Sequence, residues 1–287
     1  MAERSTSGDS ASAGRLVIVG TPIGNLADLS ERGREALSDA DLVVCEDSRR
    51  TGQLLSHLGL SGKKKIVAND HTESSQTERI VSAVAEGSEV VLVSDAGMPT
   101  VSDPGRLVVA AIVSAGLEVG VVPGPTAAMS ALSVSGFTAD RFVFEGFLPR
   151  KGVERGRRLA ELAQEQRTVV LYEAPHRLTR TVGDLIEVRG ESAKICVGRE
   201  VTKWYEEIIH GTLLDVRDRF TETEPRGEFV LVLEGAPVVE IGDSEVSAML
   251  EACRDEGLSR RDAVDEVVGL SGKRKRQVYS LALAVDF

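Results

Sequence analysis

The feature that most restricts the fold is an alternation of short apolar runs with helical stretches in the first half of the chain. The apolar runs cover residues 15–20, 41–45, 64–68, 89–94 and 117–122. Runs that are apolar at nearly every position are typical of strands covered on both faces. Helical stretches lie between them at 30–38, 49–57, 74–86 and 103–115. Capping residues begin two of these helices, Ser74–Ser75 and Asp103 with Pro104. The alternation predicts a parallel, doubly wound α/β sheet.

The second half predicts another sheet with a different character. Its expected strands are 140–146, 167–173, 193–200, 204–211 and 227–235. Helices are expected at 125–135, 153–165 and 177–187. Because the last three strands have short connections, we expect this sheet to be mixed or mainly antiparallel. Beyond it, residues 243–285 predict two short helices joined at Gly269–Gly272.

These patterns predict two α/β domains, with a mostly parallel first sheet and a mixed second sheet, followed by a small C-terminal helical domain. The expected boundaries are a disordered tail at 1–13, a first domain at 14–125, a second at 126–236 and a helical piece at 237–287. No apolar stretch reaches the roughly 18 residues of a membrane-spanning helix. Cys45, Cys196 and Cys253 lack metal or disulfide spacing, which favours buried free thiols in a cytoplasmic protein.

Four loops leave the carboxyl ends of the strands in the first half, where open α/β sheets bind ligands. They are GTPIGNL (20–26), CEDSRRT (45–51), SDAGMPTVSDPG (94–105) and PGPTAA (123–128). Any one could be an ordinary turn, since Gly, Pro, Asn and Asp dominate turns. Four such loops at one sheet edge indicate a shared binding cleft. The chain has neither a GxxxxGK[ST] phosphate loop nor a GxGxxG fingerprint, and zinc and calcium motifs are also missing. A cleft that carries Glu46, Asp47, Asp95 and Asp103 suits a ligand with a cationic or hydroxyl-rich part better than a polyphosphate.

An ordered series of motifs carries a resemblance to a known family. The motifs are VGTPIGNLADLSERG, CEDSRRTGQLLSHLGL, VSDAGMPTVSDPG, VPGPTAAMSALSVSG, FEGFLPRK, YEAPHRL and GREVTKWYEEIIHGTL. From about residue 14 to the C-terminus the chain resembles the small-subunit ribosomal RNA methyltransferase I family, among the tetrapyrrole-methylase-like enzymes that use S-adenosylmethionine. The resemblance implies 2′-O-methylation of a cytidine ribose in the decoding region of 16S rRNA, a homodimer, and a cofactor held between two α/β domains. We expect the assembled small ribosomal subunit to be the substrate, and no membrane partner.

The resemblance also implies which residues bind S-adenosylmethionine. On the loop these are Ser94, Asp95, Gly97, Pro99, Val101, Ser102 and Asp103; facing it are Thr126, Ala127, Tyr172 and Glu173, with Gly227 near the adenine. Asp95 is expected near the sulfonium or amino group, and the alternative is a carboxylate that braces the loop or caps a helix. For Tyr172 the alternative is a core aromatic with its hydroxyl at the rim. Met98 stands where the family has Thr, and Arg226 where Lys is commoner.

The catalytic residues are less restricted by the sequence. Methyl transfer needs the ribose oxygen aligned with the methyl group and its proton removed. Candidates at the same sheet edge are Glu46, Asp47, Arg49, His71, His176 and Arg177. Arg49 could instead contact a phosphate or pair with Glu46 or Asp47, and both histidines could serve as structural hydrogen-bonding groups. Much of the rate can also come from positioning alone.

RNA binding requires local cations, since the net charge of −11 argues against a protein that coats nucleic acid. Candidates in the segment 149–158 are Arg150, Lys151, Arg155, Arg157 and Arg158, which helical spacing spreads over an exposed face. Further candidates are Lys203, Lys273, Arg274, Lys275 and Arg276. A solvated helix start is the alternative for the first group. These cations and the GTPIGNL start favour RNA over methylation of a tetrapyrrole or other small molecule. The intact cofactor loops argue against the third alternative, a non-catalytic ribosome-assembly module.

Overall fold

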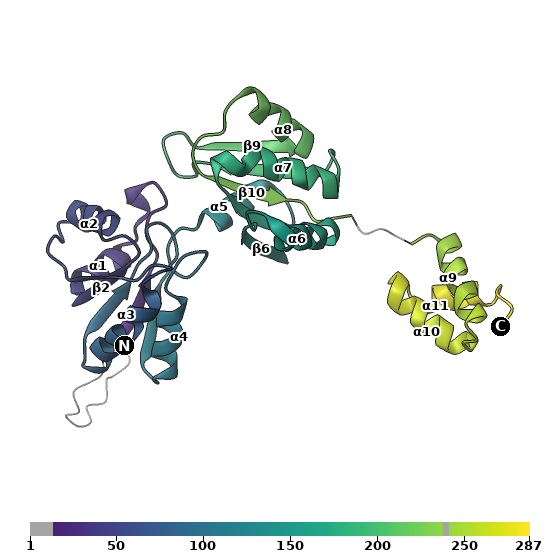
Figure 1. Cartoon of the computed structure of the whole chain (residues 1–287), viewed down its shortest axis with the longest axis horizontal. Helices are drawn as coiled ribbons and strands as arrows, with labels where there is room; N and C mark the ends of the chain where they lie inside the picture. The colour runs from purple at the N-terminus through teal and green to yellow at the C-terminus, as the bar shows by residue number, and fades with distance from the viewer. Residues whose placement is uncertain (1–13, 238–240) are drawn as a thin grey trace. The chain divides into compact units, whose positions relative to one another are not determined.

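A computed structural model describes residues 14–237 and 241–287, and the chain divides after Ala236 into two compact units (Figure 1). The predicted 1–13 tail lies outside the described residues. Within the described residues, no helix is long and apolar enough to cross a membrane. The three cysteines are free and buried, which confirms the prediction of buried thiols.

The first sheet is parallel throughout, as predicted. Its strands are β1 (Arg15–Val19), β2 (Leu42–Cys45), β3 (Lys65–Val67), β4 (Glu89–Leu92) and β5 (Glu118–Val122), in the order β3-β2-β4-β1-β5. Successive side chains of β1 serve opposite faces: Leu16 packs in one apolar cluster and Val17 in another. The first cluster includes residues of α3 (Glu73–Ala85) and α4 (Arg106–Ser114), and the second includes residues of α1 (Glu31–Asp39) and α2 (Ser48–His57). Helices on both faces explain why the strands are apolar at almost every position.

The second sheet is mixed, also as predicted. Its strands are β6 (Phe142–Phe147), β7 (Thr168–Glu173), β8 (Lys194–Arg199), β9 (Glu207–Thr212) and β10 (Phe229–Leu233), in the order β6-β7-β10-β8-β9. Only the β6–β7 pair is parallel. Helices α6 (Gly152–Gln164), α7 (Pro175–Arg189) and α8 (Leu213–Glu222) contribute to the apolar cluster on one face, and α5 (Ala127–Ser135) packs on the other.

Helix α8 was not predicted, because it starts at the residue after β9 with no connecting loop. A reciprocal capping box begins it: Thr212 accepts from the backbone N–H of Asp215, whose carboxylate accepts from the N–H of Thr212. Leu213, Val216 and Phe220 form its buried face. Their spacing is helical, so this signal was present in the sequence.

The described part of the C-terminal unit, residues 241–287, contains three helices, so the prediction of two was wrong. They are α9 (Asp243–Asp255), α10 (Arg260–Ser271) and α11 (Lys275–Ala282). The extra break follows Gly257, which has φ = 85°, and Ser259 caps α10 by accepting from the N–H of Asp262. Apolar side chains from all three helices, among them Leu250, Val264 and Val278, form a core of their own.

Candidate functional site

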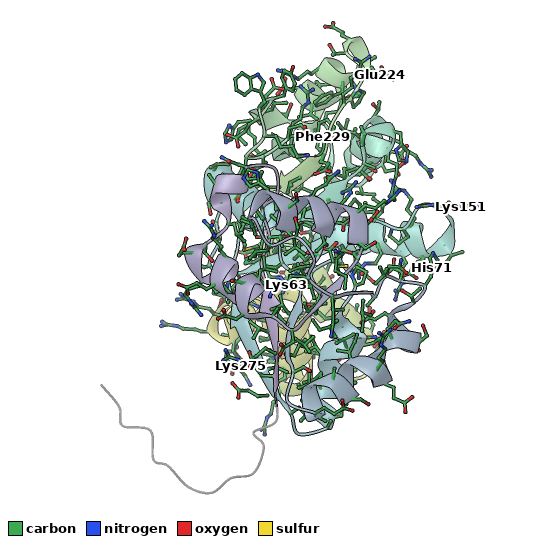
Figure 2. The ribbon with its side chains drawn as sticks, turned by 90° about the vertical axis from the view of Figure 1, so that its left-hand side faces the viewer. Lys63, His71, Lys151, Glu224, Phe229 and Lys275 are labelled. Carbon is green, nitrogen blue, oxygen red and sulfur yellow. The ribbon has the colours of Figure 1, made fainter. Side chains whose placement is uncertain are left out.

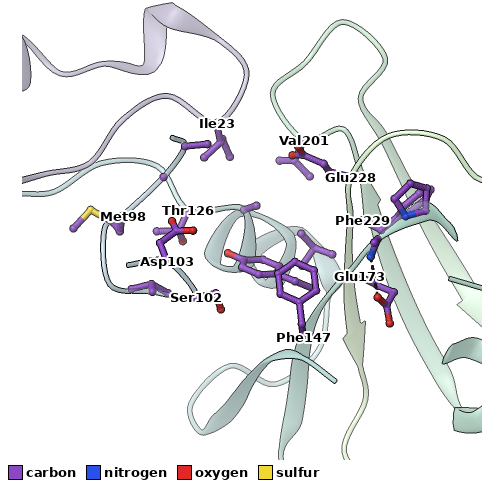
Figure 3. Close-up of a pocket in the computed structure, with 18 residues that line it drawn as sticks. Ile23, Met98, Ser102, Asp103, Thr126, Phe147, Glu173, Val201, Glu228 and Phe229 are labelled. Atoms are coloured by element: carbon purple, nitrogen blue, oxygen red, sulfur yellow. Dashed lines mark hydrogen bonds between the residues drawn. The ribbon is translucent and has the colours of Figure 1, made fainter. Parts of the chain in front are cut away.

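A cavity of about 300 Å³ lies where loops at the carboxyl edge of the first sheet meet the second sheet (Figure 3). This volume lies within the range of about 300–1,000 Å³ that is ordinary for small-molecule sites. Its lining is mainly apolar and consists of Ile23, Ala96, Gly97, Met98, Val101, Ser102, Asp103, Thr126, Ala127, Phe147, Tyr172, Glu173, Ala174, Pro175, Val201, Glu228, Phe229 and Val230. Asp103 supplies a carboxylate on one side of the cavity, and Phe147 supplies an aromatic ring on another. Tyr172 lines the cavity next to Phe147.

Backbone pairing fixes the loop at 94–105 against the loop after β1. Thr21 and Gly97 exchange two backbone hydrogen bonds, at 2.9 and 3.0 Å. The Thr21 hydroxyl also donates to the carbonyl of Ser94 at 3.2 Å. Gly97 has φ = 82°, and the non-glycine residues Thr100 and Ser102 have φ = 72° and 62°. Residues with a side chain rarely adopt positive φ angles, so the backbone of this loop is strained at Thr100 and Ser102.

The start of α4 is capped by Glu73 and not by Asp103 as the sequence suggested. Glu73 is 7% exposed, and one of its carboxylate oxygens accepts from the N–H groups of Gly105, Leu107 and Val108 at 2.6–3.2 Å. Helix α4 therefore begins only at Arg106. A carboxylate from the neighbouring helix thus satisfies the free N–H groups at the start of α4. The Asp103 side chain is released from that role and lines the cavity. The expected caps at Ser74–Ser75 are also wrong, because α3 already begins at Glu73.

Electrostatics make Asp103 the most perturbed carboxylate of the cavity. Burial raises its pKa to about 6, and the negative charges of Glu46 and Asp95 add to the effect. Burial and the charge of Asp95 also raise the pKa of Glu46. A cationic ligand group would relieve this repulsion, whereas a polyphosphate would increase it.

The opposite wall carries Tyr172 between Phe144 and Phe147, with ring centroids 5.2 and 5.6 Å away. Its hydroxyl accepts from the backbone N–H of Ala128 at 3.3 Å, and burial raises its pKa. Tyr172 therefore combines both descriptions considered from the sequence, a packed aromatic and a cavity-lining group.

Eight of the twelve predicted cofactor residues line the cavity: Gly97, Val101, Ser102, Asp103, Thr126, Ala127, Tyr172 and Glu173. The Glu173 carboxylate, however, turns into the protein, where it pairs with Arg177 at 3.1 Å and accepts from Thr181. Ser94, Asp95, Pro99 and Gly227 are outside the lining. Asp95 braces a neighbouring loop, since its carboxylate accepts from the N–H of Asp47 at 3.1 Å.

Sequence reasoning did not select the other lining residues. They are Ile23, Ala96, Met98, Phe147, Ala174, Pro175, Val201, Glu228, Phe229 and Val230. All but Glu228, Phe229 and Val230 lie within a motif quoted above, so membership of a motif was the available signal. Phe229 and Val230 lie in a wholly apolar strand, and nothing in that pattern distinguishes a cavity wall from ordinary core.

The catalytic candidates fall into separate groups. Glu46 and Asp47 line a second hollow with Ser48, Val67, Asn69 and Asp95. Arg49 is exposed and pairs with Asp47 at 2.9 Å, which lowers the pKa of Asp47 to about 2. Arg177 is tied to Glu173 and to the carbonyl of Leu148. His71 and His176 are exposed and line neither hollow. The structure thus brings Glu46 and Asp47 together and leaves both histidines apart.

The predicted RNA-binding cations also differ in their surroundings. The expectation that the first group lies wholly on an exposed face is wrong for Arg155, which is 3% exposed because it bonds to Asp184 and Thr181. Carboxylates pair with Arg157, Arg158, Lys203, Lys273 and Lys275. Arg150, Lys151, Arg274 and Arg276 are exposed, with no ion pair found among the described residues. Figure 2 shows Lys151 extending from the edge of the protein.

A family model for the tetrapyrrole (corrin/porphyrin) methylases matches residues 15–217, a span that contains the loops and most strands around the cavity. The chain belongs to the tetrapyrrole methylase family. It is therefore a methyltransferase, and S-adenosylmethionine is its methyl donor.

Curated relatives extend the match to almost the whole chain. A protein of Synechocystis sp. named ribosomal RNA small subunit methyltransferase I is 41% identical, over 95% of this chain and 99% of the relative. A protein of the same name from Mycobacterium tuberculosis is 39% identical over 95% of each chain. Another from Thermotoga maritima is 42% identical over 99% of its own length but only 77% of this chain. This methylase is thus a member of the ribosomal RNA small subunit methyltransferase I group.

Solved structures agree on the fold. A uroporphyrin-III C-methyltransferase from Thermus thermophilus, complexed with S-adenosylhomocysteine, has a TM-score of 0.54 at 22% identity and covers 77% of this chain and 97% of that one. The methyltransferase CobJ has a TM-score of 0.60 at 21% identity, over 80% of this chain and 98% of that one. At these identities the similarity establishes the architecture of the methylase.

Proposed function

We propose that this protein transfers a methyl group from S-adenosylmethionine to the 2′-oxygen of a cytidine ribose in the decoding region of 16S rRNA, within the assembled small ribosomal subunit. The observation that carries the proposal is the sequence identity of about 40%, over nearly the full chain, to proteins named ribosomal RNA small subunit methyltransferase I. The exposed cations at Arg150 and Lys151 support a polyanionic substrate.

The cavity fits the donor in charge and in polarity. Its apolar lining suits the adenosyl part, and Asp103 lies where a carboxylate can face the sulfonium or the amino group. Gly97 lines the cavity with φ = 82°, a backbone angle that residues with a Cβ rarely adopt, and without a side chain its backbone can face the ligand directly. We assign donor binding to the twelve residues predicted from the sequence, with the eight that line the cavity in direct contact. S-adenosylmethionine supplies an electrophilic methyl group, and the protein's task is to align the acceptor with it.

Among the catalytic candidates, Glu46 is best suited to accept the proton of the ribose hydroxyl. Its raised pKa brings it nearer to neutrality, where a general base works best. Asp47 is a weaker base, because Arg49 lowers its pKa to about 2. Arg49 in turn orients Asp47 and adds positive charge at the rim. Arg177, held by Glu173, acts through the shape of the neighbouring loop.

The remaining parts of the proposal concern partners and compartment. We propose that the protein works as a homodimer in the cytoplasm, where its ribosomal substrate is found. Trp204 and Tyr205 are 94% and 70% exposed, a state that favours coverage by a macromolecular partner. Light scattering after size-exclusion chromatography tests the dimer: a mass near 31 kDa, that of one chain, would contradict it.

The decisive experiment uses small ribosomal subunits from cells that lack this protein. The subunits are incubated with the enzyme and S-adenosylmethionine labelled in its methyl group, and the 16S rRNA is digested to nucleosides. We expect the label in 2′-O-methylcytidine. Label on a base, or no label in rRNA while a uroporphyrinogen substrate is methylated, would refute the proposed function. Naked 16S rRNA serves as the parallel substrate that tests the requirement for an assembled subunit.

A further inference from the structure

The segment Leu148–Lys151, between β6 and α6, is held by an unusual set of hydrogen bonds. Three consecutive backbone carbonyls each accept from a different arginine. Arg177 donates to Leu148 at 2.5 Å, Arg155 to Pro149 at 2.9 Å, and Arg180 to the carbonyl of Arg150 at 3.3 Å. Carbonyls of a surface loop are usually satisfied by water, so this segment, here termed the braced loop, is fixed by the protein itself.

A buried polar network stands behind these donors. The Arg155 guanidinium bonds to Asp184 at 2.8 Å and to the Thr181 hydroxyl at 3.0 Å. Thr181 donates in turn to Glu173, which pairs with Arg177. Arg155, Thr181 and Glu173 are 3%, 1% and 2% exposed. Buried charges persist only when they are paired and hydrogen-bonded, and here each has partners that hold it in one geometry.

The side chains that the braced loop presents are free cations. Arg150 and Lys151 are exposed, and no carboxylate among the described residues lies within 4 Å of either. By contrast, Arg157 and Arg158 on the following helix both pair with glutamates. An anionic ligand can therefore bind Arg150 and Lys151 without first displacing an internal partner.

The braced loop also lies beside the cavity. Phe147, the residue before it, lines the cavity, as do Glu173 and Ala174 from the strand and turn that lead into α7 (Figure 3). Glu173 contributes both to the cavity wall and to the network that fixes the loop. The same buried carboxylate thus connects the donor site to the placement of two cations.

We propose that the braced loop is a preformed clamp for an RNA backbone phosphate next to the reacting ribose, and that Arg155 is the positioning residue that sets its shape. The inference rests on the proposed function. A phosphate is the part of RNA that recurs at every nucleotide, and arginine with lysine is the usual pair that binds it. A rigid loop loses little conformational freedom on binding, which strengthens binding for the same contacts.

The test compares one double variant, which carries both Arg150→Ala and Lys151→Ala, with the unchanged protein. Filter binding to small subunits lacking the modification is measured from 50 to 200 mM KCl. Loss of two phosphate contacts should reduce the slope of log affinity against log salt by about 2. The affinity of the unchanged protein should then fall roughly ten-fold more across this range than that of the double variant. Affinity for S-adenosylmethionine, measured by calorimetry without RNA, should stay unchanged.

Lys64→Ala with Lys65→Ala is the matched control. These neighbouring lysines are exposed, have no ion pair among the described residues, and lie at the amino end of β3, the sheet edge opposite the cavity. This control removes the same charge and should keep the salt slope of the unchanged protein. Equal slopes for the two double variants would overturn the clamp.

Arg155→Met tests positioning, because it removes the brace while leaving Arg150 and Lys151 in place. We expect it to reduce RNA affinity and to add no further loss in the double variant. Arg155→Lys should rescue only part of the affinity, since lysine cannot make the same fork of bonds. Additive losses would show that Arg155 acts independently of the loop. If Arg155→Met does not fold, the exposed double variant still decides the clamp.

The two proposals fail differently. If the unchanged protein methylates small subunits and the Arg150/Lys151 double variant matches it in rate and salt slope, the clamp is refuted and the proposed function stands. If the unchanged protein transfers no label to small subunits, the proposed function fails.

Discussion

Replacing Asp103 with asparagine should stabilise the protein and weaken donor binding at the same time. The pKa of Asp103 is raised from 3.8 to about 6, first by burial and then by Glu46. A carboxyl group with a higher pKa in the folded state binds its proton more tightly when folded. Its contribution to stability is therefore greatest below pH 4 and is lost as the pH rises from about 4 to about 6. Above pH 6 the ionised carboxylate is a net destabilising group.

The size of the effect follows from the two pKa values. A pKa of about 6 in place of 3.8 corresponds to at most about 3 kcal/mol. Asp103 is only partly buried, so screening by solvent reduces the expected gain for Asp103→Asn to about 1–2 kcal/mol at pH 7.5. At pH 5 the native carboxyl group is already largely protonated, and the gain should fall to about half.

Urea unfolding at pH 7.5 and pH 5 measures this difference, and calorimetry measures donor affinity. Loss of a charged partner for the sulfonium or amino group should weaken binding about ten-fold or more, from roughly 1.5–3 kcal/mol for a hydrogen bond to a charged group. Asp140→Asn, at an exposed turn, is the control and should change neither quantity. The reasoning would be refuted if Asp103→Asn were no more stable than the unchanged protein at pH 7.5, or if its gain were the same at both pH values.

Three further changes test the frame around the cavity. In Gly124→Ala the new Cβ would lie 2.7 Å from the backbone of Gly20, so we expect a loss of about 1–3 kcal/mol in thermal unfolding and weaker donor binding; an unchanged melting temperature would contradict this contact. Tyr172→Phe removes the acceptor for the N–H of Ala128 and should lower stability in urea by about 1 kcal/mol. A chain ending at Ala236 should still fold and bind S-adenosylmethionine in calorimetry, because it contains the whole cavity.

Strands and helices could be predicted from the sequence where burial left a periodic pattern. Leu16 and Val17 each have a helical layer to pack against, so β1 is apolar throughout and easily identified. Helix α8 could not be separated from strand β9 in the sequence, because the capping box at Thr212 directly continues that strand. The break after Gly257 was overlooked, although the glycine and the capping Ser259 both mark a helix end and a helix start.

Side-chain partners were harder to predict, since they depend on residues distant in sequence. Arg155 belongs to a basic segment in the sequence, yet Asp184 and Thr181 on the next helix draw it into the interior. Lys203 is paired with Glu200 and Glu228. A run of cations therefore does not by itself identify a binding surface. Unlike Arg155 and Lys203, Arg150 and Lys151 have no carboxylate partner among the described residues, and only a three-dimensional arrangement reveals that difference.

The two carboxylates near the start of α4 explain how an acidic group can be kept beside a donor site. Glu73 accepts hydrogen bonds from three backbone N–H groups. These bonds satisfy both the buried carboxylate and the N–H groups that have no partner within the helix at the start of α4. If Asp103 capped the helix instead, hydrogen bonds from those same N–H groups would stabilise its negative charge. Its carboxylate would then gain little from pairing with a cationic ligand. With the cap supplied by α3, Asp103 stays under-compensated near Glu46, and its pKa is raised to about 6. If the cationic methyl donor binds at Asp103, as we propose, it restores the interaction that burial removes, and the stability lost at Asp103 is recovered as affinity for the donor.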